Sequence, residues 1–216
     1  MRGVELNLWK QRLGTVPATV WERVELEVLI LADNDLGEIS EQLGRLQRLR
    51  TLDLGHNMLE RLPDSLGALE SLCDFLYLHD NRLRALPASM ARLRRLRYLN
   101  LSENAFRCLP EALRGLTGLV ELRVSDNLLE ALPDWLGELS LRELHLRNNR
   151  LETLPTAIGA LSDLRHLDLR GNPLVELPAS IADLPALAKL DLRWTPRLVV
   201  PPWLESLGAR GVLVYR

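Results

Sequence analysis

The chain has 216 residues, a mass of 24.5 kDa and a formal net charge of −2, with 47% hydrophobic and 26% charged residues. This composition excludes a disordered chain and a membrane-spanning one, and the near-neutral charge gives no overall footprint for nucleic acid or an anionic membrane. Leucine is abnormally frequent, at 54 of 216 residues or 25%, against 2 Phe and 3 Tyr. A core built almost wholly from one aliphatic side chain predicts a regular, repeated architecture.

The N-terminal segment, residues 1–24, is predicted to be a capping turn rather than a leader, because no apolar run of signal-peptide length follows Met1. No apolar stretch long enough to span a membrane occurs further along. Cys73 and Cys108 form no paired framework or metal motif. Because unpaired thiols are typical of reducing compartments, we expect a cytoplasmic protein, or one delivered into a host cytoplasm. Arginine supplies 25 of the 27 basic residues, which is typical of a GC-rich, bacterial genome.

Residues 25–186 contain a repeat with the pattern L-x-L-x-x-N-x-L, seen clearly in residues 52–59, 99–106 and 167–174. The alternating leucines predict a strand with one buried face. Five or six residues of each turn are expected to pair with the equivalent strand of the next turn in a parallel sheet. The asparagine amide carries both donor and acceptor, so we expect it to bond its own loop and the neighbouring turn. The predicted internal ladder consists of Asn34, Asn57, Asn81, Asn104, Asn127, Asn149 and Asn172. Gln11 and Thr195 lie 23 residues outside its two ends, which makes nine turns.

A second pattern, L-x-x-L-P-x-x-L-x-x-L, follows each asparagine, as in residues 59–69. Leucines at i, i+3 and i+4 have helical spacing, and a proline at a fixed place suits a helix start, where no amide donor is needed. Each turn is therefore predicted to end in a short α- or 3₁₀-helix. The recurring prolines are Pro63, Pro87, Pro110, Pro133, Pro155 and Pro178.

Residues 187–216 are predicted to be a degenerate last repeat and a C-terminal cap. The segment from Trp194 to Leu198 departs from the pattern, residues 201–207 have the spacing of a last helix, and residues 211–215 that of a final edge strand. No turn can bury its leucine face alone. We therefore expect residues 1–216 to form a single domain.

Nine copies of this pattern in register resemble the leucine-rich repeat proteins. The 23-residue form with Leu-Pro resembles the intracellular Ras-group repeats, which include Ras suppressor, the Erbin-like scaffolds and their plant relatives. The resemblance implies an α/β fold: a right-handed solenoid, or horseshoe, with a parallel sheet on the concave face and short helices on the convex face. It also implies binding of other proteins on the concave sheet, and it identifies no partner because the contacting positions are the variable ones.

Strand alternation predicts which variable residues project from the concave face. The N-terminal half of that face is apolar and aromatic, which usually marks an interaction site. Alternatively, an end cap or a loop covers part of this apolar zone. The residues predicted to contact a partner are Trp9, Val28, Ile30, Phe75, Tyr77, His79, Tyr98, Arg123, His145, Arg147, Arg170 and Arg193.

The C-terminal half of the face is charged, and its arginines at 147, 170 and 193 lie 23 residues apart, so they stack in one column. Like charges at that spacing repel unless they are compensated. One interpretation is neutralisation by Glu143, Asp168 and Asp191, and the other is an arginine row that awaits acidic or phosphorylated residues of a partner.

The histidines at 145 and 166 lie on successive predicted strands. Metal binding needs three or four converging ligands. We therefore predict no metal site, but polar contacts and a pH-sensitive interface.

The repeat is irregular at two places, and one group of arginines is expected on the convex side. Residues 72–76 hold one residue too many and residues 139–141 one too few, which predicts either a bulge beside a strand or a harmless slip on the helical side. The arginines at 92–97, with those at 45, 48 and 114, form a convex basic patch. It lacks the interleaved aromatic residues of nucleic-acid sites, so we interpret it as a solvated face.

No phosphate loop, nucleophile elbow or metalloprotease motif is present in the sequence, and no cofactor is implied. The leading hypothesis is a non-enzymatic, monomeric adaptor that holds a protein or peptide on its concave sheet. The alternative is the recognition module of an enzymatic system, such as a ligase-type bacterial effector or a regulator of a GTPase or kinase, with catalysis elsewhere.

Overall fold

The repeat pattern folds as nine successive turns within residues 3–216, the part of the chain that this computed structural model describes. Residues 1–2 of the predicted capping turn lie outside that range. Each of the first eight turns has a three-residue strand followed by a five-residue 3₁₀-helix. The chain divides into two compact units. The first comprises the residues up to Ala105 together with Pro110–Leu119, and the second comprises Phe106–Leu109 and Val120–Arg216.

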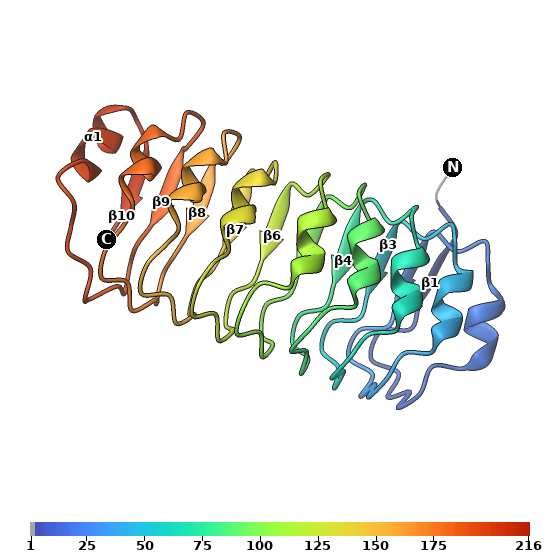
Figure 1. The fold of residues 1–216 in the computed structure, drawn as a ribbon. Helices are drawn as coiled ribbons and strands as arrows, with labels where there is room; N and C mark the ends of the chain where they lie inside the picture. Colours follow the sequence, from blue (N-terminus) through green and yellow to red (C-terminus); the bar gives the residue numbers. More distant parts are fainter. Residues whose placement is uncertain (1–2) are drawn as a thin grey trace. The chain divides into compact units, whose positions relative to one another are not determined.

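In the first unit, the strands pair in parallel in chain order and in register, with Thr51 opposite Phe75 and Phe75 opposite Tyr98. The 3₁₀-helices of the unit lie on one side of these strands (Figure 1). The strands are β1 (Glu5–Asn7), β2 (Val28–Ile30), β3 (Thr51–Asp53), β4 (Phe75–Tyr77) and β5 (Tyr98–Asn100). The helices are η1 (Ala18–Glu22), η2 (Glu41–Arg45), η3 (Asp64–Ala68), η4 (Ala88–Arg92) and η5 (Glu111–Gly115).

The second unit repeats this arrangement and ends in the predicted last helix, which is α-helical, and the predicted last strand, which pairs with the strand before it. The strands are β6 (Glu121–Arg123), β7 (Glu143–His145), β8 (His166–Asp168), β9 (Lys189–Asp191) and β10 (Leu213–Tyr215). The helices are η6 (Asp134–Glu138), η7 (Thr156–Ala160), η8 (Ala179–Asp183) and α1 (Leu204–Ala209).

The strands are shorter than the five or six residues that the sequence pattern predicted. Hydrogen bonding between turns nevertheless continues past their ends, as from the Leu54 amide to the Tyr77 carbonyl (2.9 Å) and from the His56 amide to the His79 carbonyl (2.9 Å). The extended chain stops three residues after β3, at His56, which lies in the left-handed region with φ 52°. A fully extended strand cannot continue through that conformation.

The strand alternation buries leucine as predicted. Leu52 is fully buried, whereas Thr51 and Asp53 on either side of it are half-buried on the opposite face of β3. The equivalent leucines of β2 and of β4 to β9 are also fully buried, which places one leucine core between the strands and the helices of each unit. Leu6 of the terminal strand β1 is only half-buried.

The asparagine of each turn joins that turn to the one before it. Asn57 is the clearest example: its side-chain oxygen accepts bonds from the amides of Asn34 and Leu36, at 3.1 and 3.0 Å. Its amide donates to the carbonyls of Leu31, Leu54 and Gly55, at 3.0–3.1 Å. The three carbonyls also accept from the side chains of Asn34 and Asn81 and from the Asp33 amide. The amides of Asn34 and Leu36 would be buried alone without the Asn57 side chain.

One recurring feature was not predicted from the sequence: the residue before each ladder position adopts a left-handed conformation in all nine described turns. Glycine, asparagine and aspartate tolerate this conformation best, and they occupy five of the nine positions. The residues concerned are Lys10, Asp33, His56, Asp80, Glu103, Asp126, Asn148, Gly171 and Trp194.

The helices are of the 3₁₀ type in eight turns, and each predicted proline lies directly before one, as Pro63 does with φ −69°. Successive helices pack closely. A Cβ atom at Gly67 in η3 would lie 2.2 Å from the carbonyl oxygen of Ser89 in η4, so the turn spacing requires glycine there.

The two irregularities are absorbed outside the strands. The extra residue lies in the segment Cys73–Asp74 just before β4, and β4 keeps its register with both neighbours. The missing residue follows η6, where Leu139 is extended (ψ 155°) instead of turning as Leu69 does after η3 (ψ 59°). Neither strand is bulged, so the predicted bulge is wrong. The missing residue is a slip on the helical side, as the alternative predicted, whereas the extra residue lies directly before β4.

Candidate functional site

The first unit presents three aromatic residues on neighbouring strands, which we call the aromatic cluster: Phe75 and Tyr77 on β4 and Tyr98 on β5. Phe75 and Tyr77 share a strand face because they are two residues apart, and Tyr98 is the register partner of Phe75. The ring centroids are 5.9 Å apart for Phe75–Tyr77, 5.4 Å for Phe75–Tyr98 and 5.1 Å for Tyr77–Tyr98. Phe75 keeps 43% of its surface exposed, so no cap or loop buries the cluster.

Two histidines adjoin the aromatic cluster. The His79 ring lies 6.0 Å from that of Tyr77 and 4.7 Å from that of His56, whose Nδ1 is 2.6 Å from a carboxylate oxygen of Asp80. Burial, and then the charge of His56, lower the pKa of His79. Gly55 leaves room for that ring, because a Cβ atom there would lie 2.4 Å from it.

The other apolar residues predicted for this zone do not join the cluster. Val28 and Ile30 lie half-buried on β2, and β3 separates them from β4 with Thr51 and Asp53 at the matching positions. Trp9 follows β1 with 54% of its surface exposed, and the Lys10 ammonium lies 5.7 Å from its ring centroid. The structure therefore separates the predicted apolar zone into one aromatic cluster and peripheral residues.

In the second unit, Arg170 and Arg193 are held by aspartates of the same turns. Arg170 donates through Nε to Asp168 at 2.8 Å and lies 3.6 Å from Asp191, and Arg193 donates to Asp191 at 2.9 and 2.7 Å. Burial raises the pKa of each aspartate, but the hydrogen bonds and charges of these arginines outweigh it and leave the pKa of both below its ordinary value. The interpretation of a self-neutralised column is therefore correct for these two arginines.

The remaining predicted arginines differ from that pair. The Arg123 guanidinium bonds Glu121 at 2.6 Å. Arg147 lies 3.9 Å from Asp126, and its buried Nε has no hydrogen-bond partner among the described residues. Arg147 is thus the loosest member of the predicted column.

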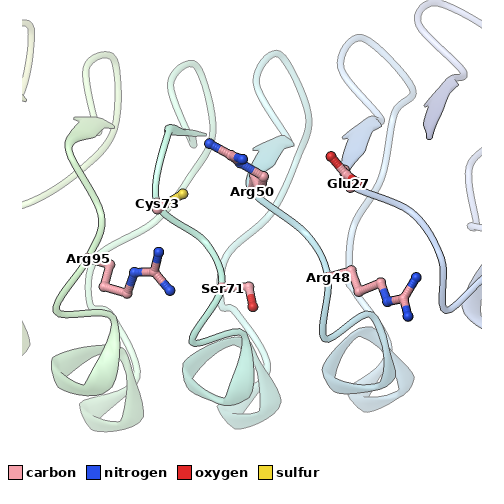
Figure 2. Close-up of a pocket in the computed structure, with 6 residues that line it drawn as sticks. All are labelled: Glu27, Arg48, Arg50, Ser71, Cys73 and Arg95. Atoms are coloured by element: carbon pink, nitrogen blue, oxygen red, sulfur yellow. The ribbon is translucent and has the colours of Figure 1, made fainter. Parts of the chain in front are cut away.

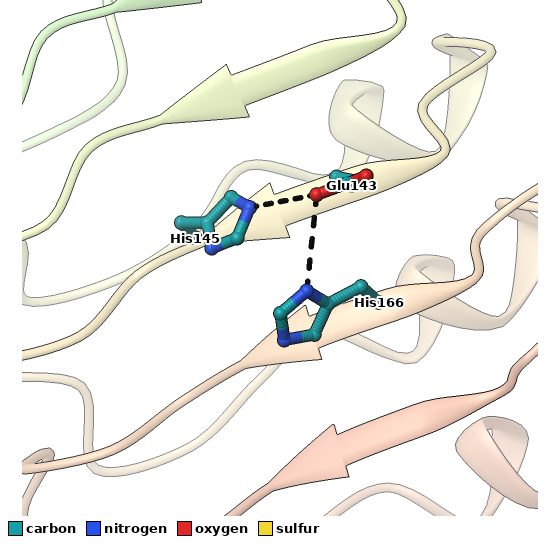
Figure 3. Close-up of side chains that lie close together, drawn as sticks. All are labelled: Glu143, His145 and His166. Carbon is teal, nitrogen blue, oxygen red and sulfur yellow. Dashed lines mark hydrogen bonds and ion pairs between the residues drawn. The ribbon is translucent and has the colours of Figure 1, made fainter.

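Glu143 brings the two histidines of the second unit together. Its Oε2 lies 3.2 Å from Nε2 of His145 and 3.8 Å from Nδ1 of His166, and Figure 3 shows both rings turned toward that oxygen. The two rings lie edge to face, with centroids 4.8 Å apart. Burial, and then the charges of His145 and Lys189, lower the pKa of His166.

From the sequence, only the two histidines of this group were expected to lie near each other, and Glu143 was expected to pair with the arginines. The strand register was the signal that could have found the group, because Glu143 is two residues before His145 and directly opposite His166.

A shallow pocket of about 330 Å³ lies away from these groups, where the chain leads from the helices into the strands of the first unit (Figure 2). Its arginines belong partly to the predicted basic patch. Arg50 is already bonded to Asp74 at 3.0 and 3.3 Å, and Cys73 donates to the same carboxylate at 3.6 Å. The lining residues are Glu27, Arg48, Arg50, Ser71, Cys73 and Arg95.

The thiols of Cys73, which is half-buried, and of Cys108, which is exposed, are both free. Across residues 3–216, every helix is too short or too polar to cross a lipid bilayer.

A family model described as "Leucine rich repeat" matches residues 24–83, 74–129 and 139–196. Among solved structures, a leucine-rich repeat protein of Leptospira interrogans is similar, with a TM-score of 0.76 and 25% identity over 97% of this chain. The ectodomain of the Arabidopsis thaliana membrane receptor kinase GASSHO1/SCHENGEN3, solved in complex with CASPARIAN STRIP INTEGRITY FACTOR 2, matches with a TM-score of 0.69 and 28% identity over 93% of this chain.

A TDR receptor shares the fold alone, with a TM-score of 0.70 and 22% identity over 99% of this chain. The chain spans 64% of the Leptospira protein, 28% of the Arabidopsis ectodomain and 46% of the TDR receptor.

Proposed function

The chain belongs to the leucine-rich repeat family, and on that premise we propose that it is a non-enzymatic module that binds a partner protein or peptide on the exposed face of its strands. The aromatic cluster is the proposed anchor, and its exposure on rigid strands is the observation that carries the proposal. Aromatic side chains are the residue type that most often dominates binding energy when a partner desolvates them. Strands hold such side chains in place, so that little side-chain freedom is lost on binding.

The chemistry of the cluster favours a partner with an apolar or aromatic side chain over one recognised by charge alone. Arg170 and Arg193 already hold buried aspartates, which reduces what they can offer to acidic or phosphorylated residues. The complex of the Arabidopsis ectodomain supports ligand binding by this fold in general. The free thiols support action in a reducing compartment, and we propose the cytoplasm.

The test compares two double variants once a partner has been isolated. Tyr77→Ala with Tyr98→Ala is expected to weaken binding at least about 30-fold, or roughly 2 kcal/mol, in titration calorimetry. Arg94→Glu with Arg95→Glu, at exposed positions before β5, is the matched control and is expected to change the affinity little. Melting curves establish that both variants fold. Loss of binding in the arginine pair with full binding in the tyrosine pair would show that the proposed face is wrong.

A further inference from the structure

A second site is suggested by the histidine group of the second unit, and it does not depend on the proposed partner-binding function. Within residues 3–216, Glu143, His145 and His166 are the one group of three metal-type side chains whose ligand atoms all lie within 4.8 Å of one another. The three side chains are half-buried, so the group is shielded without being closed to solvent.

We propose that Glu143, His145 and His166 bind a divalent transition-metal ion such as Zn²⁺, through Oε2, Nε2 and Nδ1 respectively. Two imidazoles and one carboxylate are a ligand set that such ions accept, and three protein ligands leave a fourth position open to water or to a group of a partner.

The distances suit this ion after a small adjustment. Bonds of about 2.0–2.2 Å in a tetrahedral site place neighbouring ligand atoms roughly 3.4 Å apart. The Glu143 oxygen is already 3.2 Å from the His145 nitrogen and 3.8 Å from the His166 nitrogen. One ligand atom from each of the three residues lies within 4.8 Å of the others, and side-chain rotation allows the two rings to approach further.

The backbone fixes the group. Glu143 and His145 project from the same face of β7 because they are two residues apart, and His166 is the register partner of Glu143 on β8. Parallel strands lie about 4.8 Å apart, which brings the three side chains together without any loop. Ligands on strands are held more accurately than ligands on loops.

Of the two carboxylates near His145, Glu143 is the one available as a metal ligand, because the other is bonded to an arginine. Glu121 lies 3.7 Å from His145 but is bonded to Arg123 at 2.6 Å. Lys189, the register partner of His166, has its ammonium 5.4 Å from the Tyr215 ring centroid. The Nε2 atom of His166 is buried without a hydrogen-bond partner, so no hydrogen bond at that nitrogen holds the ring in a competing orientation.

The first unit supplies a matched control. His56 and His79 are also edge to face, with centroids 4.7 Å apart against 4.8 Å in the proposed site. No carboxylate in the described chain completes a comparable group of three with them. If paired histidines alone bound the metal, removing either histidine pair would weaken metal binding equally.

The test uses the full chain without a histidine tag, stripped with a chelator and titrated with ZnCl₂ in a calorimeter at neutral pH. We expect one ion per chain, and an affinity at least about 10- to 100-fold weaker in Glu143→Gln and in His166→Ala, since loss of an outer-shell partner alone has an effect of that size. His56→Ala with His79→Ala is expected to leave the affinity unchanged. Equal binding by wild type and Glu143→Gln, or equal loss in the control pair, would overturn the proposal.

Cobalt provides a second readout. Co²⁺ bound to the wild type is expected to show the intense visible bands of a tetrahedral ion, and His166→Ala is expected to lose them. A spectrum of hydrated, six-coordinate Co²⁺ in the wild type would overturn the site. Glu143→Gln preserves side-chain size, so it carries the test even where an alanine variant fails to fold, and circular dichroism without metal establishes folding.

Discussion

Asp168 on β8 and Asp191 on β9 are direct register partners, and only 2% and 1% of their surfaces are exposed. Two like charges this close repel unless both are compensated. Arg170 supplies much of that compensation because it contacts both carboxylates, while Arg193 bonds the second. These two arginines are therefore part of what holds the last turns together.

Arg170→Ala is expected to lower the free energy of unfolding by about 3 kcal/mol, because it leaves the buried carboxylate of Asp168 without its arginine, whereas Asp191 keeps Arg193. Arg147→Ala removes an arginine from the same column, but one whose guanidinium lies 3.9 Å from the Asp126 carboxylate. We expect that change to cost less than about 1 kcal/mol. Urea unfolding of both variants measures the difference, and equal costs would show that the column is not held by these aspartates.

The aspartate pair also predicts acid sensitivity. The pKa of Asp168 and that of Asp191 are lower in the folded chain than in the unfolded one, where about 3.9 is usual. At a pH between the folded and unfolded pKa values, the unfolded chain binds more protons than the folded one. The contribution of the two aspartates to the free energy of unfolding is therefore fully present above about pH 4, and it is lost as the pH falls through the folded pKa values. Urea midpoints at several acidic pH values should fall more steeply for the wild type than for Asp168→Asn, and identical slopes would contradict this.

Asn57→Ala is expected to destabilise the protein by about 3 kcal/mol, because it leaves the buried amides of Asn34 and Leu36 without a partner. Asn100→Ala is the matched comparison, since the half-buried Asn100 side chain accepts one bond, from the Ser102 amide at 3.0 Å. That variant is expected to lose no more than about 1 kcal/mol. Thermal melting of the two proteins distinguishes them, and similar melting temperatures would count against the ladder as a source of stability.

Gly67→Ala tests the close packing of successive helices. The new methyl group would collide with the Ser89 backbone, so we expect a loss of about 1–3 kcal/mol. Gly37→Ala adds the same group where nothing lies within 4 Å, and its effect is expected to stay within about 1 kcal/mol of zero in either direction. Chemical unfolding of both variants provides the measurement, and a stable Gly67→Ala protein would mean that the turns can move apart.

Periodicity was enough to predict the succession of strand and helix, the buried leucines and the place of Asn57, because each depends on spacing within one turn. The leucine-rich repeat assignment follows from the same spacing. The left-handed residues before the ladder escaped prediction, since Glu103 and Trp194 are not residues that ordinarily mark that conformation.

Side-chain partners depended on the tertiary structure, because they are decided between turns that lie 22 to 24 residues apart. The spacing placed Arg170 in a column with two other arginines, but only the packed strands show that it contacts both Asp168 and Asp191. Likewise Glu143 faces the histidines rather than an arginine. A repeat pattern specifies which face a side chain occupies, whereas its rotamer and its choice among several charged neighbours follow from burial and competition between partners in the folded chain.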